Sequence, residues 1–136
     1  MTAYFQFSKN VPVSDAISPT KQNTLSFLLS RLFAIACLLD AGALLTYRAA
    51  WLRDTLGSDG AAAAAYTQAA AMAKLTATEN ASKVIDMALQ MHGGMGVMVG
   101  NKLESLYRDI RSLRIYEGAS EVQQLIIGKS VLKGVA

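Results

Sequence analysis

The longest feature of the sequence is a helical hydrophobic pattern from Thr20 to Thr55, between Pro19 and the turn-forming residues 57–60. Proline before such a pattern and glycine after it are typical helix boundaries. At about 1.5 Å per residue, this helix would be roughly 54 Å long, more than a small monomeric domain needs. The pattern therefore predicts a helical bundle that also packs against partner subunits.

The apolar residues of this helix occupy more than one face. Those with the spacing of a single helical face are Leu25, Leu28, Leu29, Leu32, Ile35, Ala36 and Leu39. The residues that widen this stripe are Phe33, Cys37, Leu38 and Leu44. We therefore expect the helix to be buried on more than one side.

A membrane span is the alternative for the apolar segment 25–45. Its longest uncharged piece, bounded by Arg31 and Asp40, has only about eight residues, against the roughly 20 needed to cross a bilayer. We therefore expect a buried helix of a soluble protein and no membrane span.

Composition supports one helical domain. The 136 residues are 52% hydrophobic, rich in alanine and contain two prolines, which favours a helical class over disorder or a β-sandwich. This length can bury a single core, but it is short for a complete cofactor-dependent enzyme. The predicted fold is all-α, an antiparallel bundle of two long helices, one short helix and one terminal helix.

Charge and cysteine content exclude several function classes. A net charge of +3, without a block of like charge, does not indicate nucleic-acid binding. The single cysteine, Cys37, cannot form an internal disulfide, and its apolar surroundings predict a buried reduced thiol. No metal site is expected. The N-terminal residues 1–10 lack the pattern of a secretory signal, so we expect a cytoplasmic protein.

The rest of the chain divides into an arm and three further helices. Residues 1–19 contain both prolines and no sustained periodicity, which predicts an irregular arm before a bundle domain of residues 20–136. A second helix is expected from about Gly60, capped by Ser58 or Asp59, to the glycine pair Gly93 and Gly94. After a glycine-containing loop of residues 95–101, helices are expected at 102–113 and from about 118 or 119 to 132.

Each of these helices has an expected inner face. The inward residues predicted for the second helix are Tyr66, Ala69, Met72, Ala73, Thr76, Val84, Met87 and Met91. Those predicted for the third helix are Leu103, Leu106, Tyr107 and Ile110, and the apolar positions of the last helix are Val122, Leu125 and Ile126. Four charged residues of the second helix are expected to be solvated: Lys74, Glu79, Lys83 and Asp86.

Candidate functional residues lie near the C-terminal end. Glu117 precedes Gly118 at an expected bend, where a solvated capping residue is the usual interpretation. If apolar neighbours such as Ile115 and Tyr116 enclosed the carboxylate, its pKa would rise and it could act as a general base.

Two arginines in the same region also have alternative interpretations. Arg108 and Arg111 could bind phosphate, or they could pair with a carboxylate. The candidate carboxylates are Asp109, Glu104 and Asp86.

Four short segments together resemble the C-terminal helical domain of the acyl-CoA dehydrogenases. These segments are Gln90-Met91-His92-Gly93-Gly94-Met95-Gly96, Leu106-Tyr107-Arg108-Asp109-Ile110-Arg111, Arg114-Ile115-Tyr116-Glu117-Gly118-Ala119-Ser120-Glu121 and Gln124-Leu125-Ile126-Ile127. The resemblance is specific over residues 90–127 and extends more weakly back to about Thr20, whereas residues 1–19 do not match well.

The resemblance implies an FAD-dependent oxidoreductase of fatty acid metabolism that converts an acyl-CoA thioester into a trans-2-enoyl-CoA. Glu117 matches the family's catalytic base, which takes the proton alpha to the thioester carbonyl. Tyr116 and Gly118 would line the substrate side. Hydrogen bonds to the thioester oxygen, including one from the backbone N–H of the base, would stabilise the enolate-like charge.

Two segments match the family's FAD contacts. Gln90, Met91, His92, Gly93 and Gly94 correspond to a loop that reaches the flavin of a neighbouring subunit, and glycines let backbone N–H groups approach a pyrophosphate closely. His92 is expected to be a hydrogen-bonded residue and not a catalyst.

The second FAD segment is Ala119, Ser120 and Glu121, at a helix start suited to anions. Ala119 stands where threonine is frequent in the family, which removes a hydroxyl donor.

The resemblance also implies parts that residues 1–19 do not supply. Family members carry an N-terminal helical domain, a middle β domain and one more long bundle helix, without which the helix from Thr20 would expose an apolar flank. We therefore expect a C-terminal domain or one part of a split enzyme, nearly inactive alone.

The partners implied are an acyl-CoA substrate, further copies in a homodimer or homotetramer, a separate chain carrying the missing domains, and an electron acceptor like the electron-transfer flavoprotein. The alternative is a flavin-free helical scaffold that uses the family's subunit interface.

Overall fold

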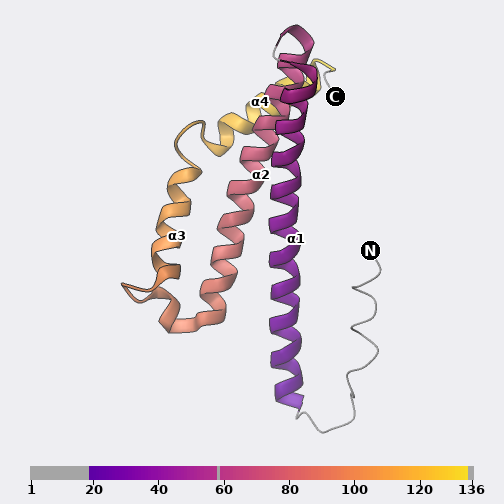
Figure 1. Cartoon of the computed structure of the whole chain (residues 1–136). Coiled ribbons are helices and arrows are strands. Elements are labelled where there is room, and N and C mark those ends of the chain that lie inside the picture. The colour runs from indigo at the N-terminus through magenta and orange to yellow at the C-terminus, as the bar shows by residue number, and fades with distance from the viewer. Residues whose placement is uncertain (1–18, 58, 135–136) are drawn as a thin grey trace.

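The computed structural model describes residues 19–57 and 59–134, which form four α-helices joined by short connections (Figure 1). The elements are α1 (Pro19–Leu56), α2 (Gly60–His92), the 3₁₀ helix η1 (Gly93–Val97), α3 (Lys102–Leu113) and α4 (Ser120–Leu132). The predicted all-α class is confirmed. The irregular arm predicted for residues 1–19 lies outside the described residues, except for Pro19, which begins α1.

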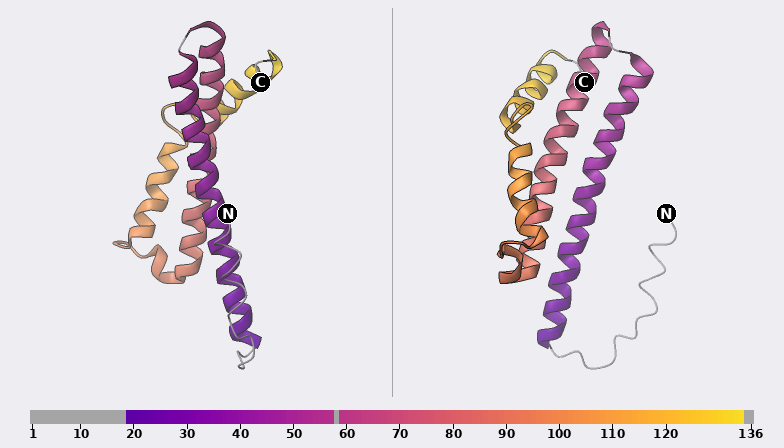
Figure 2. Two further views of the ribbon diagram at one scale, coloured as in Figure 1. Left: turned by 45° about the vertical axis from the view of Figure 1, so that its right-hand side comes forward. Right: turned by 60° about the vertical axis from the view of Figure 1, so that its left-hand side comes forward.

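Helix α2 is the centre of the described fold. It contacts α1, α3, α4 and η1, whereas α1 packs on no described element other than α2. Figure 2 shows α1 along one side of α2 and both α3 and α4 along the other. The α1–α2 hairpin is antiparallel, as predicted, and Gly57 and Gly60, both with positive φ, lie in its turn. Asp59 is the N-cap of α2, as expected, but its side chain makes no capping hydrogen bond.

Small residues line the contact between the two long helices. The buried cluster consists of Ala49, Ala69 and Ala73, with Leu45 and Leu52 partly buried against it. A Cβ atom at Gly42 would lie 3.4 Å from the Cα atom of Ala77, so the two backbones approach closely there. Alanine and glycine permit this spacing because they place little side-chain volume between the helices. The core of the chain is therefore a narrow seam.

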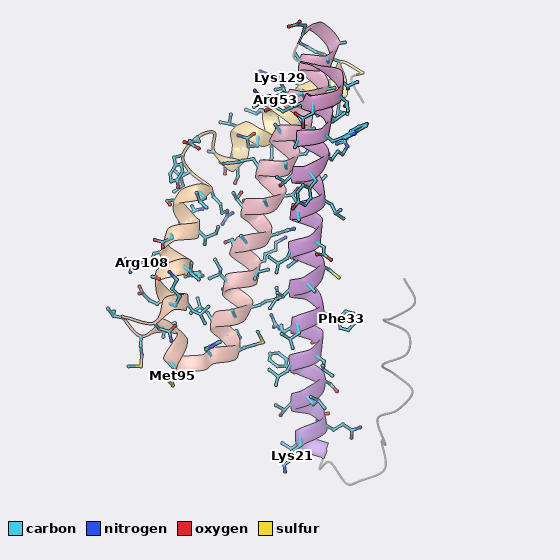
Figure 3. All side chains as sticks on the ribbon, in the orientation of Figure 1. Lys21, Phe33, Arg53, Met95, Arg108 and Lys129 are labelled. Carbon is cyan, nitrogen blue, oxygen red and sulfur yellow. The ribbon has the colours of Figure 1, made fainter. Side chains whose placement is uncertain are left out.

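The predicted burial of α1 on more than one side is wrong for this chain. Phe33 is 70% exposed, Leu44 is 68% exposed and Tyr47 is 73% exposed. Figure 3 shows the Phe33 side chain pointing away from α2. Cys37, predicted to be buried, is also exposed. Since α2 is the one described helix against α1, it covers a single stripe and leaves the expected apolar flank open.

Length and composition also make α1 a candidate membrane span. The most apolar 18-residue window of residues 20–56 has a mean hydropathy of 1.9, and 6% of that window is buried. Core helices of soluble proteins meet the same criterion of length and composition. The absence of a membrane span therefore stays a prediction.

The connection between α2 and α3 is more ordered than the predicted loop. Its first part, residues 93–97, is the 3₁₀ helix η1. Asn101 then caps α3, because its Oδ1 atom accepts a hydrogen bond from the Leu103 N–H at 2.9 Å. The Asn101 Nδ2 atom donates to the Met95 carbonyl at 2.9 Å. One side chain thus begins α3 and holds the preceding turn.

The apolar positions of helix α4 are not its buried face. Val122 and Leu125 are 45% and 62% exposed. The buried residues of α4 are instead Ser120 and Gln123. In α3, Ile110 is buried as predicted, whereas Tyr107 is 47% exposed. The α4 face on α2 is polar at its N-terminal end, where Ser120 donates to Glu79 of α2 and Gln123 donates to the Gly118 carbonyl of the preceding turn.

Candidate active site

The turn between α3 and α4, residues 114–120, is closed by hydrogen bonds of its own backbone. Its N-terminal side continues the last turn of α3, where the N–H groups of Ile115 and Tyr116 donate to the Ser112 carbonyl at 2.9 and 3.1 Å. Its two ends meet where the Ser120 N–H donates to the Arg114 carbonyl at 3.2 Å. The residues between these ends form a short non-helical loop between α3 and α4 (Figure 1).

Glu117 lies in this loop with left-handed backbone geometry. Its φ is +53°, and among the described residues it is the one non-glycine residue with positive φ. Gly118 follows with a φ of +89°. A non-glycine residue in this region costs on the order of 1–3 kcal/mol and persists where surrounding contacts hold it. Such strain is common at functional sites and directs attention to the predicted base.

Glu117 is solvated in the described chain, as its position before a glycine predicts. Glu117 is exposed, and the adjacent Ile115 and Tyr116 are 59% and 48% exposed. The apolar enclosure that a general base would need is therefore not supplied by these two neighbours. Any apolar cover over Glu117 has to come from another domain or another chain.

Two side chains of α2 contact the α3–α4 turn. The Glu79 Oε1 atom accepts hydrogen bonds from Arg114 Nε and Ser120 Oγ, both at 2.7 Å. The Lys74 Nζ atom donates to the Gly118 carbonyl at 2.5 Å. Glu79 and Lys74 are half-buried, so their predicted solvation is wrong, whereas Lys83 and Asp86 are exposed as predicted. Sequence reasoning missed both contacts because the partners lie 35–44 residues away along the chain.

The surroundings of Glu79 favour its charged form. Partial burial opposes ionisation, but hydrogen bonds from Ser120 and Arg114, together with the charges of Arg114 and Lys83, outweigh it and lower the pKa of Glu79. Glu79 therefore carries a negative charge at neutral pH and pairs with Arg114.

The second predicted FAD segment begins α4. Ala119 is the N-cap and makes no side-chain capping bond, as expected for a residue without a hydroxyl group. Ser120 is buried, and its hydroxyl group donates to Glu79. Glu121 lies exposed in the first turn of α4. The Ser120 hydroxyl is thus engaged inside the chain, which leaves the helix N-terminus itself as the group that could face a ligand.

The first predicted FAD segment forms the end of α2 and the start of η1. Gly93 has a φ of +57°, and its N–H donates to the Gln90 carbonyl. A Cβ atom at Gly93 or Gly94 would meet nothing within 4 Å, so the backbone there is open to approach. His92 Nδ1 lies 2.9 Å from the Ala88 carbonyl oxygen, which gives this histidine a hydrogen-bond partner inside its own helix. Met91 is half-buried.

A pocket of about 590 Å³ opens beside the glycine pair. It is lined by Asp86, Leu89, Gln90, Gly93, Gly94, Val97, Glu104, Tyr107 and Arg108. Arg108 pairs with Glu104 through an Nε–Oε1 contact of 2.5 Å, so Glu104 is the partner among the three carboxylates considered. Arg108 is largely exposed, as its position in Figure 3 shows.

The two predicted FAD segments do not meet within one chain. The first lies toward the N-terminal end of α3 and the second toward its C-terminal end, and the 12 residues of α3 span roughly 18 Å. The α3–α4 turn brings together Tyr116, Glu117, Gly118, Ala119, Ser120 and Glu121. The glycine pair, Gly93 and Gly94, begins η1 between α2 and α3, away from this turn.

Comparison with known protein families shows which kind of helical bundle this chain forms. Residues 26–132 match the family described as acyl-CoA dehydrogenase, C-terminal domain. The chain belongs to the acyl-CoA dehydrogenase family. The match includes the glycine pair and the whole α3–α4 turn.

Similar proteins of known name include both dehydrogenases and reductases. The mitochondrial short-chain specific acyl-CoA dehydrogenase of Bos taurus is 40% identical over 114 residues, which cover 84% of this chain and 25% of that protein. The 3-(aryl)acrylate reductase of Clostridium sporogenes is 45% identical over 95 residues, or 70% of this chain and 23% of the reductase.

The caffeyl-CoA reductase-Etf complex subunit CarC of Acetobacterium woodii is 40% identical over 99 residues, covering 73% and 24% of the two chains. The present chain therefore spans about a quarter of the length of these curated relatives.

Two places in this acyl-CoA dehydrogenase domain have the chemistry that a pyrophosphate group, such as that of FAD, would need. A pyrophosphate is bound by exposed backbone N–H groups and by helix N-termini. The open backbone at Gly93 and Gly94 offers the first kind of site, and the N-terminus of α4 offers the second. Among residues 19–57 and 59–134, no group of three His, Cys, Asp or Glu side chains could hold a metal ion.

Proposed function

We propose that this chain supplies the catalytic base and part of the flavin site of an FAD-dependent acyl-CoA dehydrogenase. It would act as the C-terminal domain of that enzyme or as one part of a split enzyme. The observation that carries the proposal is the left-handed Glu117, held at the α3–α4 turn by contacts from α2. A non-glycine residue held in a strained backbone conformation, in the turn that matches this family, is suited to a chemical role.

In this proposal Glu117 takes the proton alpha to the thioester carbonyl of an acyl-CoA. Its own backbone N–H would donate to the thioester oxygen and stabilise the enolate-like charge that develops there. Tyr116 and Gly118 would line the substrate side of the same turn. Bound FAD would supply the acceptor for the hydride that leaves the beta carbon.

The two FAD segments would serve different parts of the assembly. Gln90, Met91, His92, Gly93 and Gly94 would reach the flavin of a neighbouring protomer. Ala119, Ser120 and Glu121 would place the α4 N-terminus toward an anionic group of the cofactor. The separation of roughly 18 Å along α3 supports this division, because one chain does not bring the segments to a single point.

Other parts of the enzyme would complete the site. Glu117 is exposed in this chain, so water exclusion and positioning of the thioester would come from further domains or from a separate chain. The exposed apolar flank of α1 supports assembly as a homodimer or homotetramer. An acceptor like the electron-transfer flavoprotein would reoxidise the flavin, and the Etf complex named for one relative supports this choice.

Reconstitution tests the proposal. The chain is combined with FAD and a short acyl-CoA, with and without the proteins encoded beside it, and enoyl-CoA formation is measured. Glu117→Gln should abolish turnover because the amide cannot accept the proton. Asp109→Asn, which neutralises an exposed carboxylate of α3, is the matched control and should leave turnover unchanged. Turnover that survives Glu117→Gln would overturn the assignment of the base.

The alternative is a flavin-free helical scaffold. The observation in its favour is the apolar flank of α1, which offers a large association surface whether or not catalysis takes place. Protein purified from its native host separates the two functions. The visible absorbance of an oxidised flavin supports the enzyme, whereas a colourless oligomer supports the scaffold.

A further inference from the structure

The left-handed turn at Glu117 is held by polar side chains of α2 and by one side chain of α4. A single carboxylate oxygen, Glu79 Oε1, receives Arg114 Nε from one end of the turn and Ser120 Oγ from the other, both at 2.7 Å. These ends are the two residues that the Ser120 N–H to Arg114 carbonyl bond brings together. Glu79 therefore stabilises the closed form of the turn from outside it.

A second contact fixes the peptide that follows the base. The Gly118 carbonyl accepts from Lys74 Nζ at 2.5 Å and from Gln123 Nε2 at 3.1 Å. Gln123 is 8% exposed, so its amide is held in a set position. With two donors on one carbonyl, rotation of the peptide between Gly118 and Ala119 would break both bonds. Lys74 thus restrains the backbone next to Glu117.

The charges around Glu79 suit this role. Arg114 is its ion-pair partner, Lys83 lies nearby on α2, and Ser120 is the hydroxyl donor from α4. The Glu79 and Arg114 side chains are 29% and 27% exposed, so water screens their attraction less than it would at an open surface. A group that remains ionised keeps both of its donors bound.

We propose that Glu79, supported by Lys74, is a positioning residue that sets the backbone conformation of Glu117 before any cofactor or substrate binds. Glu79 does not touch the reacting atoms in this proposal. Its effect is to keep Glu117 in the left-handed region, which determines where the carboxylate and the adjacent N–H point. The inference rests on the proposed function only for the role of Glu117 as the base.

The first test uses the 136-residue chain without flavin or acyl-CoA, so its outcome does not depend on the proposed function. NMR measures exchange of the Ser120 amide and the φ-dependent couplings of Glu117. Glu79→Ala should accelerate Ser120 amide exchange at least tenfold and move the Glu117 couplings toward conformational averaging. Glu104→Gln removes the other described ion pair, within α3, and should change neither readout.

Unchanged couplings and unchanged Ser120 exchange in a helical Glu79→Ala chain would overturn the proposal. If that chain loses its helical circular dichroism, Ser120→Ala provides the same test, because it removes one of the two hydrogen bonds to Glu79 and leaves the ion pair. Ser120→Ala should give a smaller change of the Glu117 couplings in the same direction. No change in the couplings would again overturn the proposal.

The second test uses a reconstituted enzyme that turns over acyl-CoA. Glu79→Ala should lower kcat by roughly 10–100-fold with little change in KM, because a misplaced base slows proton transfer without removing a substrate contact. Glu79→Gln keeps an acceptor oxygen and should recover part of the lost kcat. A kcat unaffected by Glu79→Ala would overturn the positioning role even where Glu117→Gln abolishes turnover.

Discussion

The outer face of α1 and the α3–α4 turn are stabilised in opposite ways. Helix α1 presents large apolar side chains and contacts α2 alone among the described elements, through a seam of alanines. The turn is short and polar at its ends, and Glu79 and Lys74 of α2 bind both its flanks and its centre. One region has apolar surface without a described cover, and the other has its polar groups paired within the chain.

This difference separates what the chain encodes for itself from what it requires from partners. Hydrogen bonds and an ion pair over a few ångströms specify one turn geometry, because a carboxylate oxygen reaches two donors at only a limited set of positions. Apolar area is not directional, so the α1 flank favours cover without specifying its shape. The turn should therefore persist in a single chain, whereas the state of α1 should depend on association.

The largest expected effect is on self-association through the outer face of α1. The double substitution Leu32→Ser with Phe33→Ser removes two side chains that are 55% and 70% exposed in the single chain. Full burial of such a side chain contributes about 1.5–3 kcal/mol, and part of each one is already covered, so self-association should weaken by roughly 2–4 kcal/mol. Sedimentation velocity over a concentration series measures this change.

A matched control removes exposed apolar side chains away from α1. Val99→Ser with Leu132→Ser, at positions that are 93% and 89% exposed, should leave the oligomeric state unchanged. An α1 double variant that sediments like the unmodified chain would contradict the role of the flank in association.

The next effect is on the stability of the chain and depends on the backbone of the α3–α4 turn. Gly118→Ala places a Cβ atom at a φ of +89° and 2.3 Å from Gln123 Nε2. Strain of this kind should lower the free energy of unfolding by about 1–3 kcal/mol. Urea unfolding followed by circular dichroism measures the change.

Gly128→Ala is the control with the opposite expected sign. Gly128 lies inside α4, and a Cβ atom there would meet nothing within 4 Å. Alanine should raise the free energy of unfolding by about 0.5–1 kcal/mol, because glycine is the poorer helix former. A destabilised Gly128→Ala chain and an unaffected Gly118→Ala chain would together contradict the described backbone.

Local sequence patterns predicted the helices well, for a physical reason. The bounds of α1, α2 and α3 depend on hydrophobic periodicity and on proline and glycine at their ends, all of which lie within a few residues of the boundary. The prediction for residues 102–113 coincides with α3, Lys102–Leu113. Helix α2 likewise ends at His92, just before the predicted glycine pair.

Contacts between distant segments were not predictable in the same way. Lys74 and Glu79 were assigned to solvent because charged residues on a helix usually face water, and nothing near them in the chain reveals Gly118, Arg114 or Ser120. The buried residues of α4, Ser120 and Gln123, are polar and not apolar, because their hydrogen-bond partners lie outside α4 and are not evident from its own sequence. The family resemblance indicates Glu117 as a candidate base and its place before a glycine predicts its exposure, but its left-handed φ is visible only in the structure.

A smaller effect concerns the charge of Glu79. Its pKa is lowered below the ordinary value of 4.5, so its stabilising contribution is complete above that value and is lost as the pH falls through the lower folded-state pKa. Glu79→Gln should therefore reduce the free energy of unfolding by on the order of 1 kcal/mol at neutral pH, since the pair is partly exposed.

Urea unfolding over a series of pH values downward from pH 7 measures how this difference varies with pH. The difference between the two chains should shrink as the pH falls through the folded-state pKa of Glu79. A difference in the free energy of unfolding that does not change with pH would contradict stabilisation of the turn by the ionised Glu79 carboxylate.

The smallest expected effect has an unusual sign. Glu117→Gly relieves a left-handed conformation that costs about 1–2 kcal/mol, while the flexibility of glycine in the unfolded chain costs about 0.5–1 kcal/mol. The free energy of unfolding should therefore rise by roughly 0.5–1 kcal/mol although the proposed base is lost. Gln124→Gly, at an exposed helical position of α4, should instead lower it by a similar amount. If both substitutions destabilise the chain equally in urea, Glu117 carries no backbone strain, and the geometric argument for its chemical role loses its support.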